Sequence, residues 1–137
     1  MLHKLQYRVL KEQFAVCRMA AVAAAPAWPA GGELYCATRT RDELSFVCPE
    51  HFVQRAQFHQ SGEIKVERGW LALKLEGPFP FSMTGVLASF LQPLAEARVS
   101  IFAISTFDTD YVLVKEKSLP QALAALRSAG HEELPNP

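Results

Sequence analysis

One stretch of fifteen residues, IFAISTFDTDYVLVK at 101–115, constrains the fold more than any other part of the chain. Two apolar runs in it, 101–104 and 111–114, flank the polar segment STFDTD. Short runs of β-branched and aromatic residues that are bounded by Ser, Thr and Asp are typical of two strands joined by a tight turn. The stretch therefore predicts a β-hairpin.

A similar stretch occurs earlier, LYCATRTRDELSFVCPE at 34–50. Aligned without a gap on residues 101–117, it places Glu43 over Asp110, and both stretches run apolar, Thr-rich, acidic and apolar. Repeated segments of this kind indicate a structural unit that is used twice. We therefore expect two related halves, each with its own hairpin.

The composition indicates a folded protein without a nucleic-acid partner. Half of the 137 residues are hydrophobic, and nine Phe, three Tyr and two Trp can fill a core, which argues against disorder. The length suits one compact domain or two very small ones that share a core. Fourteen basic residues balance fourteen acidic ones, whereas a nucleic-acid binder normally has a basic excess on one face.

The three cysteines, Cys17, Cys36 and Cys48, each lie in an apolar run and form no C-x-x-C pair. We interpret them as small hydrophobic residues of a protein in a reducing compartment. The chain start, MLHKLQYRV, lacks the pattern of a signal peptide, and the longest apolar run, 19–30, is too short to span a bilayer. A cytoplasmic protein without a membrane contact is therefore expected.

The second half of the chain alternates strand and helix patterns. Residues 64–76 indicate two strands interrupted at Arg68-Gly69, and a helix over 83–97 follows with Ser82 as its N-cap. After the hairpin, a helix over 119–129 ends at Gly130, and a short edge strand follows. The order strand, helix, strand, strand, helix, strand is that of the split βαβ fold, an antiparallel sheet with both helices on one face.

The first half predicts the same order with shorter helices. Residues 5–17 indicate a strand pair or a strand with a bend, and one or two helical turns are expected around 27–30. The hairpin at 34–48 comes next, then a single helical turn that starts at Pro49 and a loop over 54–62. Two such halves could together bury apolar faces that neither half can bury alone.

Residues 77–119, GPFPFSMTGVLASFLQPLAEARVSIFAISTFDTDYVLVKEKSL, resemble the ACT domain in a divergent form. The segments FAVCRM, Pro-Trp-Pro and TRTRDELSFVCPE look like the degenerate first repeat of small bacterial tandem-ACT proteins. These proteins are similar to the regulatory halves of aspartate kinases and to the animal cytosolic arginine sensor. The resemblance implies an α+β fold of two ferredoxin-like ACT repeats, a degenerate one at 1–68 and a second at 69–137.

The resemblance also implies an amino-acid sensor without catalysis of its own. In ACT domains the ligand sits where two units meet, between the first strand-to-helix loop and the end of the second strand. Carried onto this sequence, the ligand-binding residues are Ser82, Met83, Thr84, Gly85, Ser105, Thr106, Phe107, Asp108 and Asp110. Arg39, Arg41 and Glu43 of the first repeat differ from the second, so the two sites cannot be equivalent.

The chemistry of these residues suits an α-amino acid. Free N–H groups at Met83, Thr84 and Gly85 and the positive end of the helix dipole could hold its carboxylate. Asp108 and Asp110 could hold its ammonium group, or they could cap their own turn. The remaining residues also allow two interpretations each, namely hydroxyl donors or cross-strand pairs for Ser105 and Thr106, and a lid or a shielded turn aromatic for Phe107.

Other functions are disfavoured by the sequence. No His, Cys or Asp spacing fits a zinc or calcium site, and no Ser or Cys nucleophile has a recognisable base. A phosphatase of this fold would need a basic phosphate cradle, and 77–85 has no Arg or Lys. The sequence therefore predicts a non-catalytic regulatory protein that needs no cofactor, forms a homo-oligomer, and acts either on a regulated protein partner or on its own assembly. The alternative is a dimerisation or docking module with a vestigial ligand site.

Overall fold

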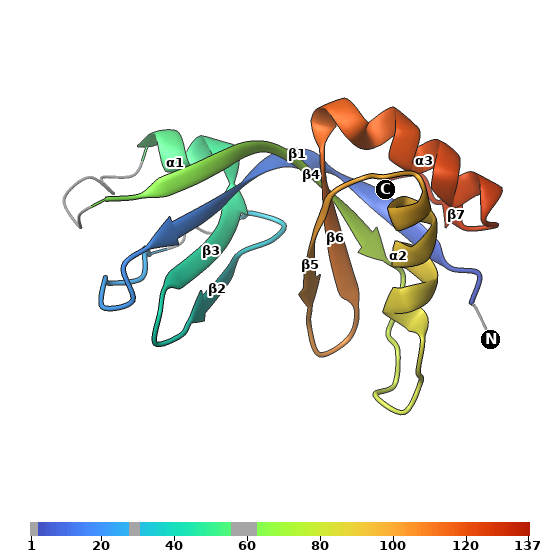
Figure 1. Ribbon diagram of the computed structural model, residues 1–137, viewed down its shortest axis with the longest axis horizontal. Helices are drawn as coiled ribbons and strands as arrows, with labels where there is room; N and C mark the ends of the chain where they lie inside the picture. Colours follow the sequence, from blue (N-terminus) through green and yellow to red (C-terminus); the bar gives the residue numbers. More distant parts are fainter. Residues whose placement is uncertain (1–2, 28–30, 56–62) are drawn as a thin grey trace. The chain divides into compact units, whose positions relative to one another are not determined.

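The computed structural model describes residues 3–27, 31–55 and 63–137, and it divides into two compact units (Figure 1). The large unit comprises Met1–Lys11 and Leu71–Pro137, and the small unit comprises Glu12–Trp70. These units differ from the sequential ranges 1–68 and 69–137, because the chain start belongs with the C-terminal part. The assignment of those two ranges as ACT repeats stays a prediction.

The large unit follows the predicted order of strands and helices. From the second half of β4 onward, the order is strand, helix, strand, strand, helix, strand. A 3₁₀ turn, Glu116–Ser118, precedes the last helix. The elements are β1 (Gln6–Met19, in part), β4 (Lys65–Leu75, in part), α2 (Val86–Glu96), β5 (Ile101–Ser105), β6 (Asp110–Lys115), α3 (Leu119–Ser128) and β7 (Glu132–Glu133).

The sheet of the large unit contains one strand more than the predicted fold. Its strands lie in the order β5, β6, β4, β1, β7, and β5 pairs with β6 in antiparallel orientation. The start of β1 lies between β4 and β7, and the last strand pairs with it in parallel, with Gln6 opposite Glu132. The expected antiparallel sheet therefore has a parallel pair at this edge, because the chain start inserts next to β7.

Helices α2 and α3 cover one face of this sheet (Figure 1). The Phe90 ring of α2 meets the Tyr7 ring of β1 edge-on, with centroids 5.3 Å apart. Burial of such apolar side chains is the main favourable term in folding. The buried core consists of Leu5, Tyr7, Leu73, Leu75, Val86, Phe90, Leu94, Val99, Val112, Val114, Ala122 and Leu126.

The prediction that Ser82 caps a helix beginning at Met83 is wrong. Helix α2 begins at Val86, and its N-cap is Gly85 at φ 78°, without a side-chain cap. The Met83 N–H donates to the Pro80 carbonyl at 2.9 Å, so this part of the chain forms a turn rather than a first helical turn. Glycine accommodates the left-handed conformation that ends the turn.

The end of α3 confirms the predicted stop at Gly130. This glycine has φ 92°, and its N–H donates to the Arg127 carbonyl at 3.0 Å. The next N–H, of His131, donates to the Leu126 carbonyl at 3.0 Å. These two bonds form a Schellman motif, which satisfies carbonyl groups at the helix end. Ser118 lies at the N-cap of α3 but makes no side-chain cap.

The small unit contains β2 (Cys36–Arg39), β3 (Leu44–Pro49) and α1 (Glu50–Arg55), together with parts of β1 and β4. Strands β2 and β1 flank β3 in antiparallel orientation. The helical turn after Pro49 is confirmed, although Pro49 itself ends β3, and α1 also covers residues 54–55 of the predicted loop. Residues 28–30 of the predicted turn at 27–30, and residues 56–62 of the predicted loop, lie outside the described residues. Buried residues of this unit include Cys17 and Cys48, as expected for small hydrophobic residues.

Strands β1 and β4 are each longer than the sequence pattern indicates. The predicted interruption of β4 at Arg68-Gly69 is wrong, since the strand is continuous from Lys65 to Leu75. Gly69 takes φ 79°, and its N–H donates to Glu50 Oε2 at 3.1 Å. The glycine therefore changes the backbone conformation within the strand without ending it. Likewise, β1 is one strand of fourteen residues and not a pair.

The two predicted hairpins form, and in each turn a Thr hydroxyl accepts a hydrogen bond from the N–H three residues further on. The loops are 40–43 and 106–109, closed by Arg39 opposite Leu44 and by Ser105 opposite Asp110. This register differs by one residue from the gapless alignment of Glu43 with Asp110. The alignment matched two acidic residues of different position, since Glu43 lies in a loop and Asp110 begins a strand. A shift of one residue exchanges the faces of a strand.

Candidate functional site

The tip of the β5–β6 hairpin and the loop before α2 lie at the same end of the large unit (Figure 1). Between them is a hollow of about 290 Å³, which we call the α2–hairpin cleft. This volume is at the lower end of the roughly 300–1,000 Å³ that is typical of ligand pockets. The cleft is lined by Phe79, Pro80, Phe81, Met83, Gly85, Val86, Leu87, Ser105, Thr106, Phe107, Asp108, Thr109 and Asp110.

The cleft brings together seven of the nine predicted site residues: Met83, Gly85, Ser105, Thr106, Phe107, Asp108 and Asp110. Ser82 and Thr84 are exposed and do not line it. Sequence reasoning missed the lining residues Phe79, Pro80, Phe81, Val86, Leu87 and Thr109. The Phe-Pro-Phe run before the helix could have indicated an apolar wall, since large apolar residues in a loop have no core of their own to fill.

A hydrogen bond joins the start of the loop to the hairpin, and the two backbones also approach closely. The Phe79 N–H donates to the Asp108 carbonyl at 2.8 Å. At Gly77, an added Cβ would lie 2.8 Å from the same oxygen, closer than real Cβ atoms come. The backbone of the loop therefore approaches the hairpin tip at a distance that only glycine allows.

The hairpin tip is built by threonine hydroxyl groups. Thr106 Oγ1 donates to the Thr109 carbonyl at 3.0 Å and accepts from the Thr109 N–H at 3.3 Å. Thr109 Oγ1 in turn donates to the Leu75 carbonyl at 2.7 Å in the buried interior. The Thr106 hydroxyl thus has a structural role, and it can offer a ligand only its remaining acceptor capacity.

The electrostatics of the cleft favour a cation on one side and an anion on the other. Among the described residues that line it, Asp108 and Asp110 are charged, and both are acidic. Helix α2 begins at the cleft and has no acidic residue in its first turn. Its first N–H groups lack partners within the helix and carry the positive end of the dipole. An ammonium and a carboxylate on one molecule fit this arrangement.

Two exposed aromatic side chains, Phe81 and Phe107, line the cleft, and we call this pair the aromatic rim. Met83, which also lines the cleft, is exposed as well. The Phe81 and Phe107 rings meet edge-on, with centroids 4.9 Å apart, yet these side chains are 75% and 78% exposed. Phe107 is therefore not a shielded turn aromatic, and the lid or wall interpretation remains. Exposed apolar groups that gather in this way mark contact sites.

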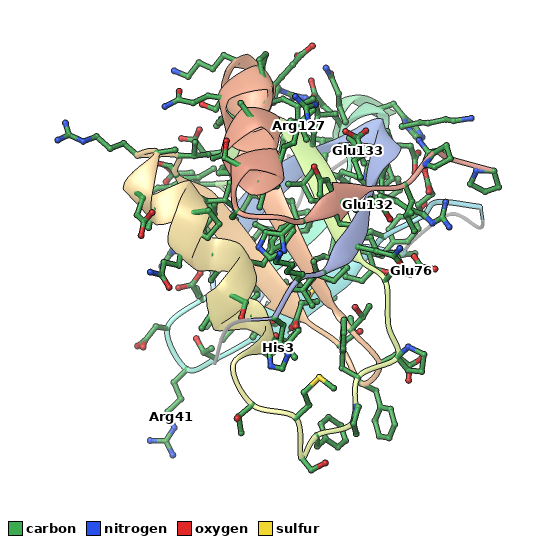
Figure 2. All side chains as sticks on the ribbon, turned by 90° about the vertical axis from the view of Figure 1, so that its right-hand side faces the viewer. His3, Arg41, Glu76, Arg127, Glu132 and Glu133 are labelled. Carbon is green, nitrogen blue, oxygen red and sulfur yellow. The ribbon has the colours of Figure 1, made fainter. Side chains whose placement is uncertain are left out.

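A larger hollow, of about 660 Å³, lies at the end of α3 beside β7 and contains none of the predicted site residues. Figure 2 shows Arg127, Glu132 and Glu133 on this side of the large unit. Burial, with the charge of Glu133 adding to it, raises the pKa of Tyr7 in this hollow to about 12.

The described residues contain no group of three or more His, Cys, Asp or Glu side chains that could hold a metal ion. Within the same residues, no helix has the length and apolar character needed to cross a bilayer.

Comparison with known proteins identifies the class. The family model for the ACT domain matches residues 65–128, and a second model, described as an N-terminal domain, matches residues 12–56. The regulatory subunit of aspartate kinase from Thermus flavus has the same fold, with a TM-score of 0.63 over 90% of this chain and 95% of its own. That structure is 13% identical in sequence, so it supports the fold alone.

Protein Atu0741 from Agobacterium tumefaciens, whose crystal structure is known, is more similar to this chain than the aspartate kinase subunit is. It is 36% identical, with a TM-score of 0.83 over 96% of this chain and 93% of its own. The chain therefore belongs to the family of ACT-domain proteins. It is also related to subunit 1 of the cytosolic arginine sensor for mTORC1 from Bos taurus, 32% identical over 81 residues. The match covers 50% of this chain and 25% of the length of that sensor.

Proposed function

We propose that this chain is a non-catalytic regulatory protein that binds an amino acid in the α2–hairpin cleft, at a contact between ACT domains. The observation that carries the proposal is the meeting of two acidic residues with a helix start in one cleft. The two features are complementary to the ammonium and the carboxylate of an α-amino acid. The name of the bovine relative, an arginine sensor, supports an amino acid as the class of ligand.

The aromatic rim supports a site that a second ACT domain completes. Phe81 and Phe107 leave the cleft mouth apolar and mostly exposed. A second domain over the rim would remove this surface from water, and it would exclude water from the ligand's charges. We propose that this second domain comes from another copy of the chain, and a dimer is the simplest such assembly. The proposal also places the protein in the cytoplasm, where it would signal ligand binding to a partner protein.

Thermal unfolding in the presence of each of the twenty amino acids tests this function. An amino acid at 100 times its dissociation constant stabilises the folded state by about 2.7 kcal/mol. We expect one amino acid, or one chemical class, to raise the melting temperature while the others do not. Unchanged melting temperatures across all twenty would contradict amino-acid binding.

A docking module with a vestigial ligand site is the second candidate, and the exposure of the aromatic rim favours it. The rim alone would then bind a partner or a second copy. In this case Phe81→Ser with Phe107→Ser abolishes self-association in sedimentation, although no amino acid changes the melting temperature. The first candidate requires that an amino acid raises the melting temperature of the unaltered protein and that this rise is lost in the same double variant.

A further inference from the structure

The chain start contacts the loop and the helix on one side of the α2–hairpin cleft through His3. Its ring Nε2 lies 2.8 Å from the Thr84 carbonyl oxygen, and its backbone N–H donates to Ser89 Oγ at 2.8 Å. Figure 2 shows His3 beside the first turn of α2, next to the loop that precedes this helix. One residue of the chain start thus contacts both the loop and the helix that form one side of the cleft.

Ser89 transmits the contact to Gly85. Its hydroxyl accepts from the His3 N–H and donates to the Gly85 carbonyl at 2.7 Å, and the Ser89 N–H donates to the same carbonyl at 2.9 Å. Ser89 is buried, so these bonds are partly shielded from water. Gly85 lines the cleft and is the N-cap of α2, and its position therefore depends on Ser89.

A second histidine holds the chain start in place. The Leu5 N–H donates to His131 Nδ1 at 3.0 Å, so the other ring nitrogen, Nε2, carries the proton and donates to the Ser89 carbonyl at 3.0 Å. The His131 ring is buried. His3 is therefore held by a chain segment that is anchored two residues further on.

The bond to Thr84 orients a donor in the cleft wall. In a trans peptide the C=O and the following N–H point in opposite directions. Because the Thr84 carbonyl points toward His3, the Gly85 N–H points away from His3. Thr84 itself does not line the cleft, while Met83 and Gly85 on either side of it do.

We infer that His3 is a positioning residue of the ligand site: it fixes the peptide between Thr84 and Gly85 so that the Gly85 N–H can donate to the ligand's carboxylate. This inference depends on the proposed function, because it assigns a role toward the same ligand. His3 acts through Thr84 and Ser89 and has no ligand contact of its own. The sequence could not indicate this role, since 81 residues separate His3 from Thr84.

The test compares His3→Ala, His3→Gln and His51→Ala with the unaltered protein. The Gln side chain can donate to the Thr84 carbonyl, whereas Ala cannot. His51 is an exposed histidine of α1 in the small unit and serves as the matched control. Binding is titrated with the twenty amino acids of the thermal experiment. We expect about a tenfold weaker affinity in His3→Ala, recovery to within about twofold in His3→Gln, and no change in His51→Ala.

Amide hydrogen exchange without any amino acid gives a second readout. His3→Ala should speed exchange severalfold at the Met83 and Ser89 amides, whose bonds define the turn and the helix start, but not at the Phe79 amide. Unchanged exchange at Met83 and Ser89 would overturn the inference, and so would faster exchange with unchanged affinity. If no amino acid binds the unaltered protein, the proposed function fails, and the exchange rates still decide whether His3 holds the loop.

Discussion

The Ser105 hydroxyl donates a hydrogen bond to Asp110 Oδ1 at 2.5 Å, joining the last residue of β5 to the first residue of β6. Asp110 lines the α2–hairpin cleft, and the bond fixes one of its carboxylate oxygens there. Carboxylates have two oxygens with about four acceptor positions, so Asp110 can bind an ammonium group while keeping this bond.

Asp110→Asn should therefore weaken amino-acid binding without unfolding the protein. The change keeps the shape and an acceptor for Ser105 but removes the charge that attracts an ammonium. Since hydrogen bonds to charged groups contribute about 1.5–3 kcal/mol, we expect at least a tenfold rise in the dissociation constant measured by calorimetry. Asp42→Asn, in the exposed turn of the other hairpin, is the control. Equal affinity of Asp110→Asn and the unaltered protein would remove Asp110 from the site.

Thr106→Ala and Thr40→Ala form a matched pair. Each hydroxyl accepts from an N–H three residues on, at 3.3 Å from Thr109 and at 3.1 Å from Glu43, and each turn loses this bond in the variant. We expect both variants to lower the free energy of urea unfolding by about 1 kcal/mol. Amino-acid binding should weaken in Thr106→Ala alone, since Thr106 lines the cleft and Thr40 does not. Equal binding by the two variants would show that the shape of the hairpin tip does not matter.

Gly77→Ala should disturb the contact between the loop and the hairpin tip. The new Cβ would lie 2.8 Å from the Asp108 carbonyl oxygen and 3.2 Å from Thr109 Cβ, so the tip must move. Forcing an extra methyl group into a packed contact typically costs about 1–3 kcal/mol, which urea unfolding would measure. We also expect weaker amino-acid binding. A loss of stability below about 0.5 kcal/mol would mean that the tip moves freely.

Stability should fall at high pH because of Tyr7. Burial first, and the charge of Glu133 second, raise its pKa from 10 to about 12 in the folded protein. A pKa raised by folding gives stability that is complete below pH 10 and is lost as the pH rises through 12. The loss corresponds to roughly 2–3 kcal/mol. Tyr7→Phe keeps the packing against Phe90 and cannot ionise.

Urea unfolding of both proteins between pH 8 and pH 12 isolates this effect, because other titrating groups act on both equally. Above pH 10 the unfolding free energy of the unaltered protein should fall relative to that of Tyr7→Phe. A constant difference would mean that the Tyr7 hydroxyl ionises as easily in the folded as in the unfolded chain.

The order of elements in the large unit was predictable because each element buries one regular face. Phe90 and Leu94 recur at helical spacing in α2, and Val112 and Val114 alternate in β6. Gly130 ends α3 through a conformation that glycine adopts without strain. Local patterns of this kind need no knowledge of the rest of the chain.

The remaining features depend on contacts that are distant in sequence. The start of β1 joins the large unit through β7, with Gln6 opposite Glu132, and no local pattern reports such a pairing. The sequence predicts the helix start three residues too early because Ser82 is a common N-cap residue, whereas the bond from the Met83 N–H to the Pro80 carbonyl makes a turn there. The gapless alignment predicts a hairpin register that is off by one residue, because the order of residue types matches while Glu43 lies in a loop and Asp110 begins a strand.

The candidate site was predictable in its residue types and only partly in its geometry. The resemblance to ACT domains pointed to the loop and the strand end, and Asp108 and Asp110 do line one cleft with Gly85. Val86 and Leu87, in the apolar part of the lining, carried no chemical signal of their own. A contact such as that of His3 with Thr84 appears only when the folded chain brings the two residues together.

The central claim is that the start of α2 and the tip of the β5–β6 hairpin bind one amino acid together. An NMR titration of the ¹⁵N-labelled protein with the amino acid that raises the melting temperature most tests this claim directly. We expect saturable shifts of the backbone amides at 83–88 and 105–110, with one dissociation constant for both segments, and no shifts at 130–134 beside the second hollow. Shifts confined to 130–134, or absent from both cleft segments, would contradict the claim.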